Sequence, residues 1–150
     1  MIENEMWMDF PALPENESFA RMVISGFMLP MNPTLEQLAD VKTAVSEAVT
    51  NAIVHGYGNS RGIVRLQAVR EDDGKLTVEI IDHGKGIEDI EHARQPFYTT
   101  SPEDERSGMG FTVMESFMDQ VEVFSCVGKG TTVRMMKRMD ARAEALARQA

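Results

Sequence analysis

The chain has 150 residues, 43% of them hydrophobic and 26% charged, which predicts a single globular domain with its own core. Its formal net charge of -9 excludes direct nucleic-acid binding unless a local basic patch overrides it, although a polyanion could bind through glycine-exposed amides, a helix N-terminus, a cation or a metal. No apolar run reaches the roughly 18 residues of a membrane span, no signal-peptide pattern opens the chain, and a lone cysteine, Cys126, cannot form an internal disulfide, so we expect a cytoplasmic protein.

The first third of the chain predicts one strand and two helices. Alternating apolar residues over 6–10 indicate a strand. Apolar residues at helical spacing predict a helix over about 15–28. Thr34 followed by Gln37 is the pattern of a capping box, and the helix behind it should end near Gly56, a residue suited to a C-terminal stop.

The middle of the chain predicts a hairpin followed by a long loop. Strands are expected over 63–69 and 76–81, joined by an Asp- and Gly-containing turn at 71–74. The next segment, 83–107, is rich in Gly, Pro, Thr and charge and shows little periodicity. A loop of this length in a small domain is usually functional or mobile.

The last third predicts a short helix over 110–118, a hairpin with strands over 121–125 and 131–136, and a helical tail over 140–150. The resulting order is β-α-α-β-β-loop-α-β-β. Consecutive strands joined by short turns favour a two-layer α+β sandwich, with a mostly antiparallel, mixed sheet and helices on one face.

Three polar residues lie at i, i+4 and i+8 on the second helix: Glu47, Asn51 and His55. A carboxylate beside a carboxamide offers hard oxygen ligands suited to Mg²⁺, and the carboxylate could instead act as a base. The alternative is that Glu47 and Asn51 lie on a solvated helix edge, and that His55 compensates the helix dipole.

A second pattern, Asp82-x-Gly84-x-Gly86, follows an apolar strand. A buried Asp there can accept a hydrogen bond from an exocyclic amine, and the glycines would let a flat ring approach the backbone. The alternative is a simple turn after an edge strand. Thr131, at the start of the last strand, is a candidate hydroxyl for contacting the same base.

A third pattern, from Arg106 to Gly110, places two glycines at a helix N-terminus beside a cation, which suits an anion. The patterns of other nucleotide sites and enzymes are missing: there is no Rossmann fingerprint, no P-loop, no His-Arg-Asp or Asp-Phe-Gly kinase element, no zinc-ligand spacing and no nucleophile elbow.

Taken in this order, the elements resemble the Bergerat (GHKL) ATP-binding fold shared by Hsp90, gyrase, MutL and histidine kinases. The sequence is most similar to the anti-sigma-factor serine kinases, and among them to the anti-sigma F factors of sporulation. The stretches that carry this resemblance are 16–21, 45–57, 82–86 and 105–111. The resemblance extends over nearly the whole chain and leaves out mainly the C-terminal tail.

The resemblance implies Glu47 as the general base and Asn51 as a Mg²⁺ ligand. It implies that Asp82 receives the adenine amino group with help from Thr131. The other nucleotide-binding residues that it implies are Gly84, Gly86, Thr100, Arg106, Ser107, Gly108 and Gly110. Arg21 matches the family's partner-contacting arginine.

By the same resemblance, the chain is expected to bind and inhibit a sigma-F-type factor. It is also expected to use Mg-ATP to phosphorylate an anti-anti-sigma factor on serine, and to form a homodimer for which the first strand could supply an edge. Ser101 stands where a lysine is expected, which lowers the positive charge near the phosphates. The alternative function is a nucleotide-gated anti-sigma module without catalysis.

Overall fold

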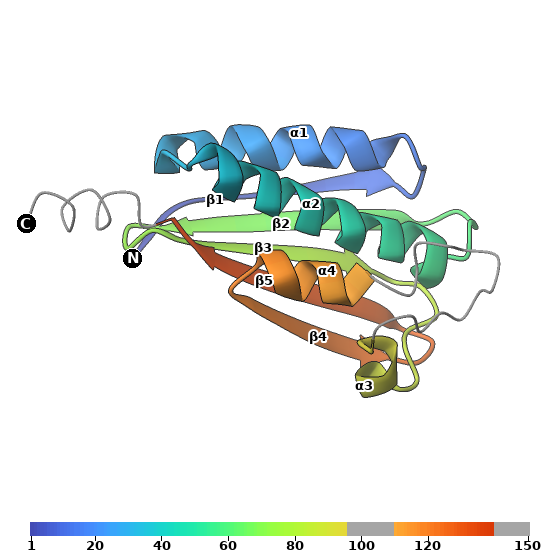
Figure 1. The fold of residues 1–150 in the computed structure, drawn as a ribbon. Coiled ribbons are helices and arrows are strands. Elements are labelled where there is room, and N and C mark those ends of the chain that lie inside the picture. The colour runs from blue at the N-terminus through green and yellow to red at the C-terminus, as the bar shows by residue number, and fades with distance from the viewer. Residues whose placement is uncertain (96–109, 140–150) are drawn as a thin grey trace, which may run out of the picture.

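The protein is described by a computed structural model over residues 1–95 and 110–139, and this part folds into two layers (Figure 1). One layer is a five-stranded sheet in the order β1-β2-β3-β5-β4. Its strands are β1 (Ile2–Pro11), β2 (Ile63–Glu71), β3 (Lys75–Asp82), β4 (Gln120–Cys126) and β5 (Gly130–Arg138). All four neighbouring pairs are antiparallel. The predicted α+β sandwich is confirmed, and its described sheet contains no parallel pair.

The other layer consists of helices that lie on one face of the sheet (Figure 1). They are α1 (Asn16–Met28), α2 (Leu35–Asn51) and α4 (Gly110–Phe117). A 3₁₀ turn (Leu29–Met31) follows α1, a π turn (Ala52–Gly56) continues α2, and a short helix, α3 (Ile90–Ala93), lies in the loop after β3. None of the helices in the described ranges is long and apolar enough to cross a membrane.

The core fills the space between the layers, because alternate residues of the strands face the helices. The buried apolar residues of β2 and β3 are Val64, Leu66, Ala68, Leu76, Val78 and Ile80. Burying each large aliphatic side chain contributes roughly 1.5–3 kcal/mol to stability. On α1 the buried positions are Ala20, Ile24 and Met28, whereas Phe19 and Met22 are exposed. The apolar character of α1 therefore extends beyond the face that packs.

The start of α2 is held by the predicted capping box. Thr34 Oγ1 accepts the Gln37 N–H at 3.0 Å, and the Gln37 side chain accepts the Thr34 N–H at 2.9 Å. The helical segment ends at Gly56, as predicted, but it does so through the π turn and without a positive φ at this glycine. Gly56 is required for another reason: a Cβ at this position would lie 2.8 Å from the Asp82 carboxyl group.

The short helix α4 is fixed to both layers at its C-terminal end. Lys137 Nζ on β5 donates to the Phe117 carbonyl at 2.6 Å and lies 3.6 Å from Asp40 Oδ2 on α2. A cation at the end of a helix offsets the dipole and satisfies a carbonyl that has no partner within the helix. Lys137 thereby joins β5, α2 and α4.

Candidate functional site

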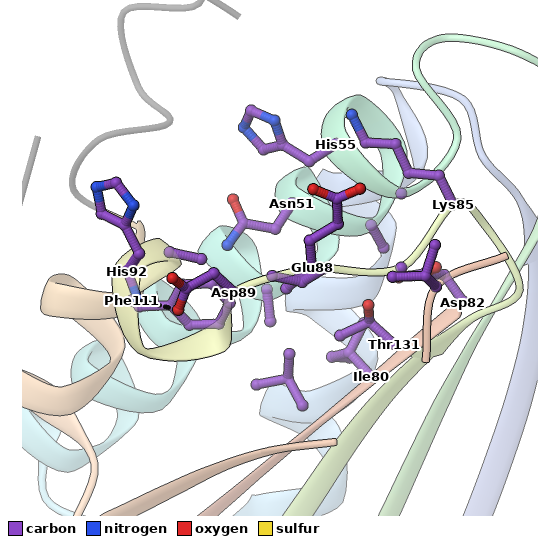
Figure 2. A pocket seen from close by; sticks show the side chains of 18 residues that line it. Asn51, His55, Ile80, Asp82, Lys85, Glu88, Asp89, His92, Phe111 and Thr131 are labelled. Carbon is purple, nitrogen blue, oxygen red and sulfur yellow. Dashed lines mark hydrogen bonds between the residues drawn. The ribbon is translucent and has the colours of Figure 1, made fainter. Parts of the chain in front are cut away.

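A cavity of about 550 Å³ opens between the end of α2, the start of α4, the ends of β3 and β5, and the loop that contains α3 (Figure 2). A volume of this size suits a nucleotide-sized ligand. Its apolar wall consists of Ala48, Ala52, Ile80, Ile87, Ala93, Phe111, Val127 and Val133. Its polar and charged groups are Asn51, His55, Asp82, Lys85, Glu88, Asp89, His92 and Thr131. The cavity therefore combines apolar walls with a few polar groups, as small-molecule sites usually do.

The closed end of the cavity contains Asp82 and Thr131, which are the two polar residues among the buried side chains of the described chain. They are opposite each other in the ladder between β3 and β5. Asp82 Oδ1 accepts the Gly84 N–H at 2.9 Å, and Thr131 Oγ1 lies 2.8 Å from Ser125 Oγ. Burial raises the pKa of the Asp82 carboxyl group, and the amides of Gly84 and Thr131 counteract part of this rise. The sequence prediction of a buried Asp at the end of a strand is confirmed.

The glycines after Asp82 are needed for close backbone packing. A Cβ at Gly84 would lie 1.9 Å from the Gly56 carbonyl oxygen. A Cβ at Gly86, which has a φ of +77°, would lie 2.3 Å from the Cys126 carbonyl oxygen. Only Gly86 lines the main cavity, whereas Gly84 lines a shallower hollow beside it. Because Gly84 and Gly86 have no side chains, the loop after β3, the π turn and the β4–β5 hairpin can pack closely around Asp82.

The other end of the cavity brings Asn51 next to the start of α4. A Cβ at Gly110 would lie 3.0 Å from Asn51 Nδ2 and 3.1 Å from its Oδ1. Glycine at this position lets the first turn of α4 approach the carboxamide. Among the residues of 1–95 and 110–139, no three His, Cys, Asp or Glu side chains are grouped to hold a metal. A metal here would take Asn51 and ligand oxygens, which fits the preference of Mg²⁺ for few protein ligands.

Glu47 and His55 flank Asn51 on the same helical segment. His55 lines the cavity together with Asn51, and both side chains are visible at its mouth (Figure 2). Glu47 is half-buried one turn before Asn51 and is not among the residues that line the cavity. The predicted stripe thus contributes two residues to the cavity itself and one beside it. The π turn, which sequence periodicity did not predict, carries His55, and π turns are frequent at functional sites.

Four residues of the cavity lip lie in the segment that the sequence predicts only as a functional loop: Lys85, Glu88, Asp89 and His92. Asp89 also accepts the His92 N–H at 3.0 Å and so caps the four-residue helix α3. The local sequence signal for this helix is an Asp immediately before its first residue, a residue type that commonly caps helices. The four lip residues come together at one cavity only in the fold, and their spacing in the sequence does not predict it.

Several predicted residues lie elsewhere. Thr100, Arg106, Ser107 and Gly108 are outside the described residues. Arg21 lies on α1, away from the cavity, and forms an ion pair with Glu17, with 2.8 Å between Arg21 Nε and Glu17 Oε1. The structure therefore brings Asn51, Asp82, Gly86, Gly110 and Thr131 to one region and leaves Arg21 on a separate surface.

This arrangement defines a class of protein. The family model described as "Histidine kinase-like ATPase domain" matches residues 10–137. The catalytic domain of histidine kinase ThkA superposes with a TM-score of 0.55 at 14% identity, covering 89% of this chain and 96% of that one. The RsbU and RsbW domains of Rv1364c from Mycobacterium tuberculosis give a TM-score of 0.66 at 20% identity, covering 91% of this chain and 32% of that one. The chain belongs to the histidine kinase-like ATPase domain family.

More similar relatives specify the branch of this family. The anti-sigma F factor of Thermoanaerobacter sp. (strain X514) is 57% identical over 134 residues, which are 89% of this chain and 93% of that protein. The anti-sigma F factor of Clostridium acetobutylicum is 57% identical over 138 residues, 92% of this chain and 96% of that protein. That of Pasteuria penetrans is 50% identical over 142 residues. The chain is a member of the anti-sigma F factor family.

Proposed function

We propose that the protein binds Mg-ATP in the cavity, transfers its terminal phosphoryl group to a serine of an anti-anti-sigma protein, and also binds and inhibits a sigma-F-type factor. The observation that carries the proposal is the polarity of the cavity. A carboxylate and a hydroxyl are buried at its closed end, and a carboxamide meets a helix N-terminus at the other. These groups match the two ends of an adenine nucleotide.

At the closed end, the second oxygen of Asp82 accepts the exocyclic amino group of adenine, while Oδ1 is engaged by the Gly84 amide. Thr131 supplies a hydroxyl beside it, and Ser125 holds that hydroxyl in place. The apolar walls exclude water from the faces of the ring. A hydrogen bond to a buried, charged acceptor is strong enough to select the base, at roughly 1.5–3 kcal/mol.

At the open end, Asn51 would hold the Mg²⁺ ion, and the start of α4 would lie beside the phosphates. When bound, Mg²⁺ would neutralise phosphate charge and orient the terminal phosphoryl group. Gly110 permits this approach, since any side chain there would contact the Asn51 carboxamide. The family resemblance assigns the remaining phosphate contacts to Thr100, Arg106, Ser107 and Gly108.

In the transfer step, Glu47 accepts the proton of the substrate serine hydroxyl. The serine oxygen forms a bond to the terminal phosphorus as the bond from that phosphorus to the bridging oxygen breaks, which releases ADP. Positioning and charge neutralisation supply most of the rate enhancement in such reactions. A base contributes a further factor of roughly 10²–10⁴.

Two surfaces would bind protein chains: the outer side of α1 and the edge of the sheet formed by β1. Arg21 presents its guanidinium on α1, where Phe19 and Met22 are exposed. A homodimer would form along β1, which pairs on one side with β2 and is the last strand at that edge of the sheet. Unpaired backbone groups along such an edge can pair with a second strand.

The test is a phosphotransfer assay with terminally labelled ATP, Mg²⁺ and the anti-anti-sigma protein of the same genome. The proposal expects one phosphoserine per substrate chain, with none when that serine is replaced by alanine. Label that remains in ATP, or label on the kinase itself, would contradict it.

One observation favours a second candidate, a nucleotide-gated anti-sigma module without catalysis: Glu47 is not among the residues that line the cavity. Under this alternative, ATP would change affinity for the sigma factor without any transfer to serine. Comparing sigma-factor binding in ATP and in a non-hydrolysable analogue separates the two functions, since only the kinase gives phosphoserine.

A further inference from the structure

A polar bridge connects α1 to α2 at the position next to Glu47. The Ser46 hydroxyl on α2 donates to Glu17 Oε1 on α1. The same Glu17 oxygen lies 2.8 Å from Arg21 Nε, one turn further along α1. One carboxylate oxygen is therefore shared by a hydroxyl of the catalytic helix and by the guanidinium of the proposed partner-contacting residue.

The bridge contacts Arg21 along the side of the guanidinium that faces α1. Arg21 Nε is buried beside Glu17 in an ion pair that lacks the alignment of a hydrogen bond, and Arg21 Nη2 donates to Ser18 Oγ at 3.2 Å. Its Nε and one terminal nitrogen therefore face its own helix. Its side chain is still 40% exposed, which leaves its outer edge accessible to a partner. A guanidinium that is fixed along one edge is prepared to bind a carboxylate along the other, since less side-chain entropy is lost on binding.

Helix packing alone does not need this bridge. The helices α1 and α2 contact each other, and both bury apolar residues in the core, among them Ala20, Ile24 and Val45. Glu17 is in the first turn of α1, where a carboxylate is favoured by the dipole without any partner. The Ser46 hydroxyl therefore adds direction to a contact that would exist without it.

We propose that Ser46 is a positioning residue for partner recognition: its hydroxyl orients Glu17, and Glu17 holds Arg21 in the geometry that receives an acidic side chain of the protein partner. Because Ser46 immediately precedes Glu47, the residue that orients Arg21 through Glu17 and the proposed base lie on the same turn of α2. This inference rests on the proposed function for the identity of the partner and of the base.

The experiment compares Ser46→Ala and Ser46→Thr with the wild type, using the anti-anti-sigma protein of the same genome as the probe. Dissociation constants for this protein and for ADP are measured together with kcat and KM for phosphotransfer. Ser46→Ala should raise Kd and KM for the protein about tenfold. It should leave the Kd for ADP unchanged and kcat within about twofold. Ser46→Thr keeps the hydroxyl and should restore most of the affinity.

Two controls separate positioning from general damage. Thr43→Ala removes another hydroxyl of α2, one that bonds only within its own helix to the Ala39 carbonyl, and should leave the Kd for the partner unchanged. In an Arg21→Ala background, Ser46→Ala should have no further effect, because the group that it orients is gone. Non-additivity of this kind identifies an interaction within one network.

The outcomes distinguish this inference from the proposed function. If the wild type transfers phosphate and Ser46→Ala binds the partner as tightly as the wild type, or if its effect adds fully to that of Arg21→Ala, the inference is wrong. If the wild type binds the partner without transferring phosphate, the kinase proposal fails, and the same binding comparison still decides the role of Ser46. If Ser46→Ala weakens ADP binding as much as partner binding, the bridge supports the whole fold and the inference is overturned.

Discussion

Asp82 and Thr131 are cross-strand partners at the ends of β3 and β5, and both side chains are buried at the closed end of the cavity. The pairing sets a carboxylate acceptor beside a hydroxyl that can both donate and accept. An adenine edge offers one donor and one acceptor, so the pair complements it.

Replacing Asp82 by asparagine should weaken the binding of ADP by tenfold or more. The variant keeps an oxygen for the Gly84 amide but turns a donor toward the adenine amino group, and a hydrogen bond to a charged acceptor is worth roughly 1.5–3 kcal/mol. Isothermal titration calorimetry measures the change. Asp89→Asn is the control, because Asp89 also lines the cavity and asparagine caps a helix equally well. Equal affinities for the wild type and Asp82→Asn would contradict the assigned adenine contact.

The same variant should be more stable than the wild type in the absence of nucleotide, and increasingly so as pH rises. Burial raises the pKa of Asp82 in the folded protein above its unfolded value of about 3.9. Below that value the carboxyl group is protonated in both states. As pH rises through the raised pKa, the unfolded state releases its proton first and the wild type loses stability. Urea unfolding at several pH values between 4 and 7 should show the gap between the two proteins growing; a gap that shrinks would refute the assignment.

Gly84→Ala should destabilise the fold by roughly 1–3 kcal/mol, because the new Cβ would lie 1.9 Å from a backbone oxygen and a clash with backbone is not relieved by a rotamer change. Gly26→Ala is the matched control on α1, where a new Cβ meets nothing within 4 Å. In a helix this change should stabilise by roughly 0.5–1 kcal/mol. Thermal unfolding of both variants gives the comparison, and similar melting temperatures would count against the packing described around Gly56.

Lys137→Met should cost roughly 1–3 kcal/mol, because it leaves Asp40 and the Phe117 carbonyl without their cation in a largely buried position. Much of the loss should appear at α4, whose C-terminal end this lysine holds. Hydrogen exchange in α4 should increase relative to that in β2. By comparison, Arg65→Met removes an exposed ion pair with Asp9 and should leave the unfolding midpoint almost unchanged. A Lys137→Met protein as stable as the wild type would show that the cap is dispensable.

The parts of the fold that local signals encode could be predicted from the sequence. The capping box of Thr34 and Gln37 acts within one turn, and the alternation in β2 and β3 directly reflects one buried face. The π turn could not be predicted in this way, since it brings Gly56 under Asp82, a residue 26 positions later. On α1, the spacing of Phe19 and Met22 gave a helix but did not reveal that these residues remain exposed.

The site was predicted to a similar extent. Asp82, Thr131 and Asn51 lie in patterns with a chemical rationale, and they do meet at one cavity. The sequence did not identify four further cavity residues, because an aperiodic loop gives no spacing from which to infer a shared surface. These residues are Lys85, Glu88, Asp89 and His92. Their position depends on close backbone contacts of Gly84 and Gly86, which only the three-dimensional structure reveals.

The most direct test of the proposed kinase is single-turnover transfer by Glu47→Gln at saturating Mg-ATP and saturating anti-anti-sigma protein. Glutamine preserves the size and polarity of the side chain but cannot accept the serine proton, so the rate should fall by a factor of about 10²–10⁴. The dissociation constants for ADP and for the protein substrate should stay at their wild-type values. A Glu47→Gln protein that transfers phosphate at the wild-type rate would contradict the account.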